Sequence, residues 1–484
     1  MKAFTYTFKE GLLKGLRRFA LHPRNEQTLV ECHNAMPCEE GLRPHKVVHS
    51  LDSDTILGDG TWDVFSWPFP QVRFLDQYVI GFARSGTDLL LCELTYDGSD
   101  IWTSTSVYNL GAASNIDQIE VADSGPFYMM SVSGKPVDTV IIESYIRNPT
   151  AIGDKITKLP NDYIPKHLAM CNYNGQFLIG GIIPGVAASF GDLGLHTVAW
   201  SQIGRIEFRI DNSVTRTAGY TNMPWKGQDV GIVYKLAKLG KFVMVYGDGG
   251  RLALIPYSQP VSGYGQQLLS RGGVRSGNHV DGDDLIHGFI DINYDWWTID
   301  GSLKATKWGY REFMKDLIEN GATRVSFEPI ERRFYISNGV KGFVFTEQGL
   351  YSTHQLVSSI GNHLGILSGF FEDSEDTEYR IVSDTLDFGL RGLKTVETME
   401  IGIDTPDHVF GAVDYRYDKT GTFTRSPWNR TNKQGGVGII KTAPEFRLGV
   451  KTDNYEDVNL DYMDLSVKIS DKRMLRRKYN IKEK

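Results

Sequence analysis

The sequence has 484 residues, of which 41% are apolar, 23% are charged and 12% are aromatic, and its formal net charge is −7. A chain of this length is longer than one hydrophobic core normally accommodates, so we expect two or more domains. The acidic balance disfavours a protein that wraps nucleic acid. Four cysteines are too few for a disulfide scaffold, so we expect reduced thiols in a protein that matures in the cytosol.

The glycine content indicates the fold class. The 51 glycines exceed the usual share of about 7%. A glycine excess without low complexity indicates many turns, and many turns indicate short strands. We therefore expect an all-β protein.

Residues 1–50 are predicted to form an extended segment ahead of the first domain. Their opening, MKAFTYTFKEGLLKGLRRFALHPR, keeps charges through its middle. Because no apolar run forms there, we expect no secretory signal.

Residues 51–365 contain strand pairs that meet at glycine turns. In KFVMVYGDGGRLALIPY, a glycine cluster separates two apolar runs. A phosphate-binding loop would need a helix after the glycines, whereas a second strand follows here. Since glycine takes a positive φ without strain, the pattern predicts a β-hairpin. The predicted turns are Ser85–Thr87, Ser133–Pro136, Gly247–Gly250, Asp300–Gly301 and Asn338–Gly339.

These hairpins recur at a regular interval. Their apolar centres lie 38 to 65 residues apart, close to the 40 to 50 residues of a four-stranded propeller blade. We predict a β-propeller of about six blades over residues 51–365, with a β-sandwich of the same hairpins as the alternative. The centres are Val79, Tyr128, Leu178, Val243, Trp297 and Tyr335.

The longest uncharged run is FLIGGIIPGVAASFG, Phe177–Gly191. It contains a proline and is shorter than a membrane span. We predict a flexible apolar loop. An alternative is a loop that inserts into a partner or contacts a membrane.

The segment GYREFMKDLIENG predicts a helix that ends at Gly321. Phe313 and Leu317 lie at positions i and i+4, with Met314 and Ile318 beside them, which gives one apolar face. We expect an insertion between blades that contacts a partner or the next domain.

The acidic stretch FFEDSEDTEYR is predicted to link the propeller to a second domain. Beyond it, apolar and polar residues alternate, which is typical of half-buried antiparallel strands. Residues 366–470 are therefore predicted to form a C-terminal β-sandwich. Residues 471–484 form a basic arm, expected to be mobile, that could meet phosphates or acidic patches of a neighbouring subunit. The alternating residues are Met399, Ile401 and Ile403; Phe446, Leu448 and Val450; and Met463, Leu465, Val467 and Ile469.

Two clusters of metal-binding residue types lack metal-site spacing. Cys32 and Cys38, with His33 between them, have no second ligand pair, so we predict ordinary thiols. The stretch HVDGDDLIHG lacks the glutamate that closes a calcium loop. We predict a polar turn before the strand LIHGFIDI. Its candidate ligands are His279, Asp281, Asp283, Asp284 and His287.

Motifs for catalysis are weak. TYDGSDIW, Thr95–Trp102, is similar to the Asp-box turn of sialidase propellers, but its glycine is displaced and Ile101 precedes the tryptophan. A nucleophile elbow, a Walker loop and H-E-x-x-H do not occur. We predict no catalytic residue, no cofactor and no metal, and the alternative is a carbohydrate-active propeller.

Four phrases carry a resemblance to a known family. VAWSQIGRIEF looks like a W-S-x-x-G blade segment, and VYGDGGRLALIPY is similar to the hairpin that follows it. SDTLDFGLRGLKTVETMEIGID looks like a transition from propeller to sandwich, and RRFALHPRNEQTLVECHNAMPCEEGLRP is similar to an N-terminal extended piece. Together they resemble the tail-hub or nozzle proteins of short-tailed bacteriophages, also called head-to-tail stabilisation proteins. The likeness is diffuse and spans most of the chain, and the compact length fits a hub.

The resemblance implies a structural protein of the virion tail that assembles in the host cytoplasm. Its partners would be copies of itself in a six-fold ring, the portal or head-tail adaptor, and other tail proteins or fibres. DNA would pass through the lumen during ejection, and an acidic wall would repel its phosphates. The alternatives are a carbohydrate-active or glycan-binding propeller of a phage tail, and a receptor-binding module in which Trp225, Trp297 or Trp428 contacts glycans.

Overall fold

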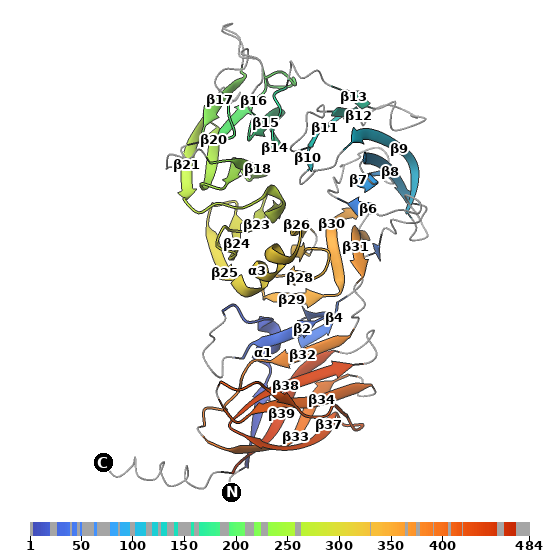
Figure 1. Ribbon diagram of the computed structural model, residues 1–484, viewed down its shortest axis with the longest axis vertical. Coiled ribbons are helices and arrows are strands. Elements are labelled where there is room, and N and C mark those ends of the chain that lie inside the picture. The colour runs from blue at the N-terminus through green and yellow to red at the C-terminus, as the bar shows by residue number, and fades with distance from the viewer. Residues whose placement is uncertain are drawn as a thin grey trace, which may run out of the picture. The chain divides into compact units, whose positions relative to one another are not determined.

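In the computed structural model, the chain forms two compact units (Figure 1). Unit 1 comprises residues 1–47, 340–356 and 373–484, and unit 2 comprises residues 48–339 and 357–372. The structure describes residues 3–19, 27–38, 41–45, 49–50, 62–64, 78–85, 88–96, 102–112, 119–123, 127–132, 140–143, 156–158, 164–183, 193–208, 217–223, 231–256, 263–329, 331–363, 366–373, 378–390, 392–404, 408–418, 420–452 and 459–470.

The described part of unit 2 contains five four-stranded sheets, each made of consecutive antiparallel strands. It also contains the antiparallel hairpin β26 (Arg324–Glu328) and β27 (Arg333–Ser337), and a three-stranded sheet of β30 (Gln355–His363), β31 (Ile366–Asp373) and β5 (His49–Ser50). The five sheets are β6 (Trp62–Val64), β7 (Tyr78–Ser85), β8 (Asp88–Tyr96) and β9 (Trp102–Ala112); β10 (Ile119–Asp123), β11 (Phe127–Val132), β12 (Val140–Glu143) and β13 (Ile156–Lys158); β14 (Ala169–Tyr173), β15 (Gln176–Gly180), β16 (Thr197–Trp200) and β17 (Gly219–Asn222); β18 (Val233–Leu239), β19 (Phe242–Gly247), β20 (Arg251–Pro256) and β21 (Tyr264–Ser270); and β22 (Val280–Gly282), β23 (Ile286–Ile290), β24 (Trp296–Asp300) and β25 (Ala305–Gly309).

The sheet β18–β21 is packed on both faces, as propeller blades are. In β19, Val243 and Val245 lie in a core shared with the sheet β14–β17. Met244 and Tyr246, which point the other way, lie in a core shared with the sheet β22–β25. The first strand β14 also contacts the first strands β10 and β18 of the flanking sheets. Stacking of this kind confirms the predicted propeller blades.

The glycine turns lie where the sequence predicts them. The Gly247 N–H donates to the Gly250 carbonyl at 3.0 Å and closes the hairpin of β19 and β20. At the Asp300 turn, the carboxylate accepts the backbone N–H of Ser302 at 2.9 Å and of Lys304 at 3.1 Å. The predicted blade centres lie in second strands, except that Trp297 lies in the third strand β24. Residues 86–87 and 133–136 lie outside the described residues.

The predicted apolar loop at Phe177–Gly191 needs a correction. Phe177 to Gly180 belong to β15, the second strand of its blade, and the side chains of Leu178, Ile179 and Ile182 have 0% exposure. These side chains pack on both faces of the blade, so they cannot contact a partner or a membrane. Residues 184–191 lie outside the described residues.

The predicted helix is α3 (Arg311–Asn320), between β25 and β26. Met314 and Leu317 are fully buried within unit 2. Asn338 donates its side-chain amide to the Leu317 carbonyl at 2.9 Å, which satisfies an acceptor in the last turn. The helix therefore buries this face inside the unit. None of the described helices is both long enough and apolar enough to cross a membrane.

Unit 1 contains two packed sheets. Gly411 marks their close approach, because a Cβ added there would contact Met399 and lie 3.1 Å from a Val437 methyl group. One sheet has the order β3 (Ala35–Cys38), β4 (Gly41–Pro44), β39 (Leu460–Ile469), β33 (Lys394–Ile403) and β37 (Gly436–Ala443), and β1 (Ala3–Phe8) also pairs with β39. The other has the order β28 (Gly342–Phe345), β29 (Leu350–Thr353), β2 (Leu29–His33), β32 (Tyr379–Ser383), β38 (Glu445–Thr452), β34 (Val409–Arg416) and β35 (Thr424–Arg425), and β36 (Asn429–Arg430) pairs with β34.

The predicted alternation places the core of this sandwich correctly. Met463, Leu465 and Val467 of β39 are fully buried, and so are the predicted inward residues of β38. The division of the chain differs from the predicted one, however. Strands β1 and β2 pair with β39 and β32 inside unit 1, and residues 340–356 belong to the same unit. The arm 471–484 lies outside the described residues.

Candidate functional site

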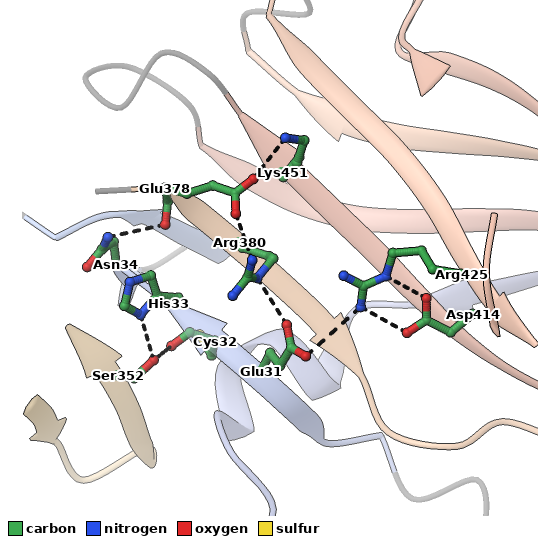
Figure 2. Close-up of polar contacts among 10 residues, drawn as sticks. All are labelled: Glu31, Cys32, His33, Asn34, Ser352, Glu378, Arg380, Asp414, Arg425 and Lys451. Atoms are coloured by element: carbon green, nitrogen blue, oxygen red, sulfur yellow. Dashed lines mark hydrogen bonds and ion pairs between the residues drawn. The ribbon is translucent and has the colours of Figure 1, made fainter. Parts of the chain in front are cut away.

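A chain of alternating charges runs across the second sheet of unit 1 (Figure 2). Strands β2, β32, β38, β34 and β35 each contribute side chains to it, and Glu378 comes from the residue just before β32. Adjacent members lie within ion-pair distance of one another. The members, in spatial order, are Lys451, Glu378, Arg380, Glu31, Arg425 and Asp414.

Strand register explains why an acid lies between two cations. Arg380 is the direct cross-strand partner of Lys451, and like charges in that position repel. The Glu378 carboxylate bridges them, with one oxygen 2.8 Å from Arg380 Nη1 and the other 2.9 Å from Lys451 Nζ. Arg380 Nε lies 3.0 Å from the Glu31 carboxylate. The Glu378 carboxylate therefore offsets the repulsion between the two cations.

Within the charge chain, Arg425 and Asp414 form a bidentate ion pair. Arg425 Nε and Nη2 donate to the two Asp414 oxygens at 2.6 and 2.9 Å. This bidentate geometry is the strong form of an ion pair. The hydrogen bond to Asp414 raises the pKa of Arg425 above its usual value.

A partly buried indole lies beside these charges. The Trp428 ring centroid is 5.2 Å from Arg425 Cζ and 5.6 Å from Lys451 Nζ. Its ring covers the backbone at Gly449, where an added Cβ would lie 2.9 Å from Trp428 Cη2. Glycine thus lets the indole approach the sheet closely beside two cations. Trp428 and the charge chain together are named the Trp428 face.

Next to this face, Ser352 and His33 form a serine–histidine contact at 3.1 Å. The Ser352 hydroxyl donates to the Cys32 carbonyl at 2.8 Å, so His33 Nδ1 donates to the serine oxygen. A nucleophile needs the opposite arrangement, in which the imidazole accepts the hydroxyl proton. The contact therefore ties β2 to β29.

Within HVDGDDLIHG, residues 283–285 form the predicted polar turn, which connects β22 to β23. Asp283 accepts the N–H groups of Leu285 and Ile286 at 2.8 and 2.9 Å, and Asp281 accepts the Phe327 N–H at 2.7 Å. His287 is 1% exposed and contacts Tyr246 and the Lys238 carbonyl, both at 2.9 Å. Burial lowers the pKa of His287 to about 4.

The predicted thiols are free cysteines. Cys32 and Cys171 are buried and Cys38 is partly exposed. Burial raises the pKa of the Cys32 thiol far above its usual value. Within the described ranges, no group of three or more potential ligands is placed to hold a metal ion.

Several sequence candidates cannot be placed. Residues 97–101 of the Asp-box-like stretch, Trp225 and the basic arm lie outside the described residues. The charge chain was not predicted, because its members are far apart in the sequence and carry no motif. Trp428 is the one member of the Trp428 face that the sequence analysis named.

Comparisons with known proteins bear only on fold. No family model matches the sequence, and no curated protein matches it. Among solved structures, the chain is similar to PorZ, an essential bacterial surface component of the type-IX secretion system of Porphyromonas gingivalis, with a TM-score of 0.34 and 10% identity over 76% of this chain and 46% of PorZ. BamB from Moraxella catarrhalis gives a TM-score of 0.30 and 13% identity over 83% of this chain and 95% of that chain. The WD40 domain of Toxoplasma gondii coronin gives 0.35 and 11% over 70% and 86%.

The chain spans less than half of PorZ, and all three TM-scores are below 0.5, so these similarities carry no argument about function. The fold follows instead from the sheets themselves, which are consecutive, antiparallel and four-stranded in unit 2. The chain is an all-β protein with β-propeller blades in unit 2 and a β-sandwich in unit 1.

Proposed function

We propose that this protein is a structural component of a bacteriophage tail. It would be a hub- or nozzle-like ring protein that joins the portal or adaptor to the distal tail and forms part of the DNA channel. The phage assignment depends on the sequence resemblance, and the propeller and sandwich agree with the fold that the resemblance implies.

The Trp428 face is the structural observation that supports a role in assembly. Trp and Arg are enriched where proteins meet, and Trp428 lies beside Arg425 with Lys451 close by. The ion pairs hold these side chains in one arrangement before a partner arrives. Less conformational entropy is then lost on association, which favours binding. We therefore assign this face to contact with a neighbouring subunit or tail protein.

Assembly of the purified full-length chain tests the proposal. Light scattering and negative-stain microscopy are expected to show closed rings, and the rings are expected to bind the portal or adaptor. Trp428→Ala should shift the population toward smaller particles. Tyr220→Ala, at an exposed tyrosine of unit 2, is the matched control and should assemble normally. A monomer that binds neither portal nor adaptor would rule out the proposal.

A second candidate function uses the same indole. A partly exposed tryptophan can stack on a sugar ring, so Trp428 also fits a glycan-binding tail protein. Incubation with bacterial polysaccharides separates the two functions. Binding or release of reducing ends that is lost in Trp428→Ala supports the second, and an unchanged polysaccharide with intact rings supports the first.

A further inference from the structure

Arg251 is a buried cation for which the described part of the chain provides no ion pair. It opens β20, directly after the Gly247–Gly250 turn, and is 5% exposed. Its Nε and Nη1 atoms are buried and make no hydrogen bond. A guanidinium stays protonated in proteins, and an uncompensated buried charge is strongly unfavourable. Unpartnered donors of this kind call for a physical explanation, and a bound ion is one.

The guanidinium carbon of Arg251 lies over two aromatic rings of the neighbouring blade. Arg251 Cζ lies 4.3 Å from the Phe289 ring centroid and 5.0 Å from the Trp297 centroid. The two rings are parallel to within 5°. The rings attract the cation but offer no oxygen or nitrogen acceptor to its N–H groups, so Nε and Nη1 remain available to an acceptor.

The neighbouring protein groups already have other partners. Asp291, whose charge acts on Arg251, accepts two N–H groups of its own turn and Trp297 Nε1, all within 2.9 Å. The hydroxyl of Tyr246 contacts His287 Nδ1. His287 Nε2 donates to a backbone carbonyl, so its Nδ1 accepts the tyrosine proton. Neither group makes a hydrogen bond with Nε or Nη1 of Arg251.

Further cations surround the same aromatic rings. Lys307 Nζ lies 5.6 Å from the Trp297 centroid. Lys307 and Arg311 share one carboxylate, Asp295, at 2.8 and 2.6 Å. The cluster thus holds three cations and two acids. The cations are Arg251, Lys307 and Arg311, and the acids are Asp291 and Asp295. The local charge therefore favours an anion.

We propose that Arg251, which lies over the Phe289 and Trp297 rings, anchors a site for a small oxyanion. The site binds one carboxylate or phosphate group. Such a group accepts two parallel N–H bonds from one guanidinium edge. Burial of the donors selects a small free ion over a bulky partner. The site lies in unit 2 and is independent of the Trp428 face.

Thermal unfolding of the full-length chain tests the site. Inorganic phosphate and acetate are titrated separately, with sodium chloride at matched ionic strength as the reference. We expect a saturable rise in the unfolding temperature of unit 2 with at least one of the two ions, and the better ion identifies the class. Arg251→Met should abolish the rise. Arg275→Met, at an exposed arginine stacked on Tyr294, should keep it.

The variants also separate binding from folding. Arg251→Met replaces an unpaired charge with an apolar side chain, so without added anion we expect it to be at least as stable as the wild type. If it does not fold, Arg251→Lys serves instead, and it should lose most of the response because a lysine lacks the planar fork. Calorimetric titration of the wild type with phosphate and acetate provides a second readout. The proposal is overturned if neither ion exceeds sodium chloride, or if the Arg251 variants respond as the wild type does.

Discussion

Gly273 shows how closely backbone segments approach in unit 2. A Cβ added at this position would overlap the Gly247 carbonyl oxygen and lie 2.6 Å from that of Asp248. Neither segment can easily move, because Val274 donates its N–H to the Gly247 carbonyl at 2.9 Å. Only glycine therefore fits between the β19–β20 hairpin and the start of the next blade.

We expect Gly273→Ala to lower the free energy of unfolding of unit 2 by about 2–4 kcal/mol. The added methyl group would clash with backbone atoms of Gly247 and Asp248, which cannot rotate away as a side chain could. Urea denaturation followed by tryptophan fluorescence measures the change. Gly272→Ala is the control, since its added Cβ would have its nearest contact at 3.7 Å. Equal stability of the two variants would contradict the close approach.

At the scale of elements, the alternation of charges on β32 and β38 depends on the side chain of Glu378. Glu378 is the acid between Arg380 and Lys451, which are direct cross-strand partners. The three side chains are no more than 31% exposed, so solvent screens them incompletely. Removal of the Glu378 charge leaves two cations opposite each other.

We predict that Glu378→Gln lowers the free energy of unfolding of unit 1 by about 1 kcal/mol, and by less in 1 M salt. The double variant Glu378→Gln with Lys451→Gln should recover part of the loss. Glu10→Gln, which breaks the exposed pair with Lys14, should have little effect. A double variant no better than the single one would argue against repulsion as the cause.

Elements were predictable from sequence where their signals are local. The Gly247–Gly250 and Asp300–Gly301 turns carry their own conformational requirement, so they were located correctly. Leu178 was named as a blade centre, but the predicted apolar loop begins too early, at Phe177. Burial on both faces of β15 removes the alternation that would mark where the strand ends, and its apolar run continues past Gly180. Cross-strand pairs such as Glu31 with Arg380 had no signal, because the partners are far apart in the chain.

At the scale of the whole molecule, acid should destabilise unit 2. Burial lowers the pKa of His167, His279 and His287 to about 4 each. In the unfolded chain the pKa of a histidine is about 6.5. Below that pH the unfolded state therefore binds protons that the folded state does not bind. The stability from neutral burial is complete above about pH 7 and is lost as pH falls toward 4.

We expect the unfolding free energy of unit 2 to drop between pH 7.5 and pH 5, by on the order of 1–2 kcal/mol per histidine. Denaturant titrations at the two pH values measure the drop. His287→Gln removes one titrating group and should reduce it, whereas His196→Gln, at a partly exposed histidine, should leave it unchanged. A drop of the same size in all three proteins would point to other groups.

The pairing of β1 with β39 has a consequence for biogenesis. Ala3 to Phe8 are synthesised hundreds of residues before their partner, Met463 to Lys468. At roughly 5–20 residues per second, the first strand waits about 20 to 90 seconds for its partner strand. The blades, whose strands are neighbours in order of synthesis, can close meanwhile. A nascent chain stalled before β39 should therefore expose an unpaired strand edge, a ready target for chaperones.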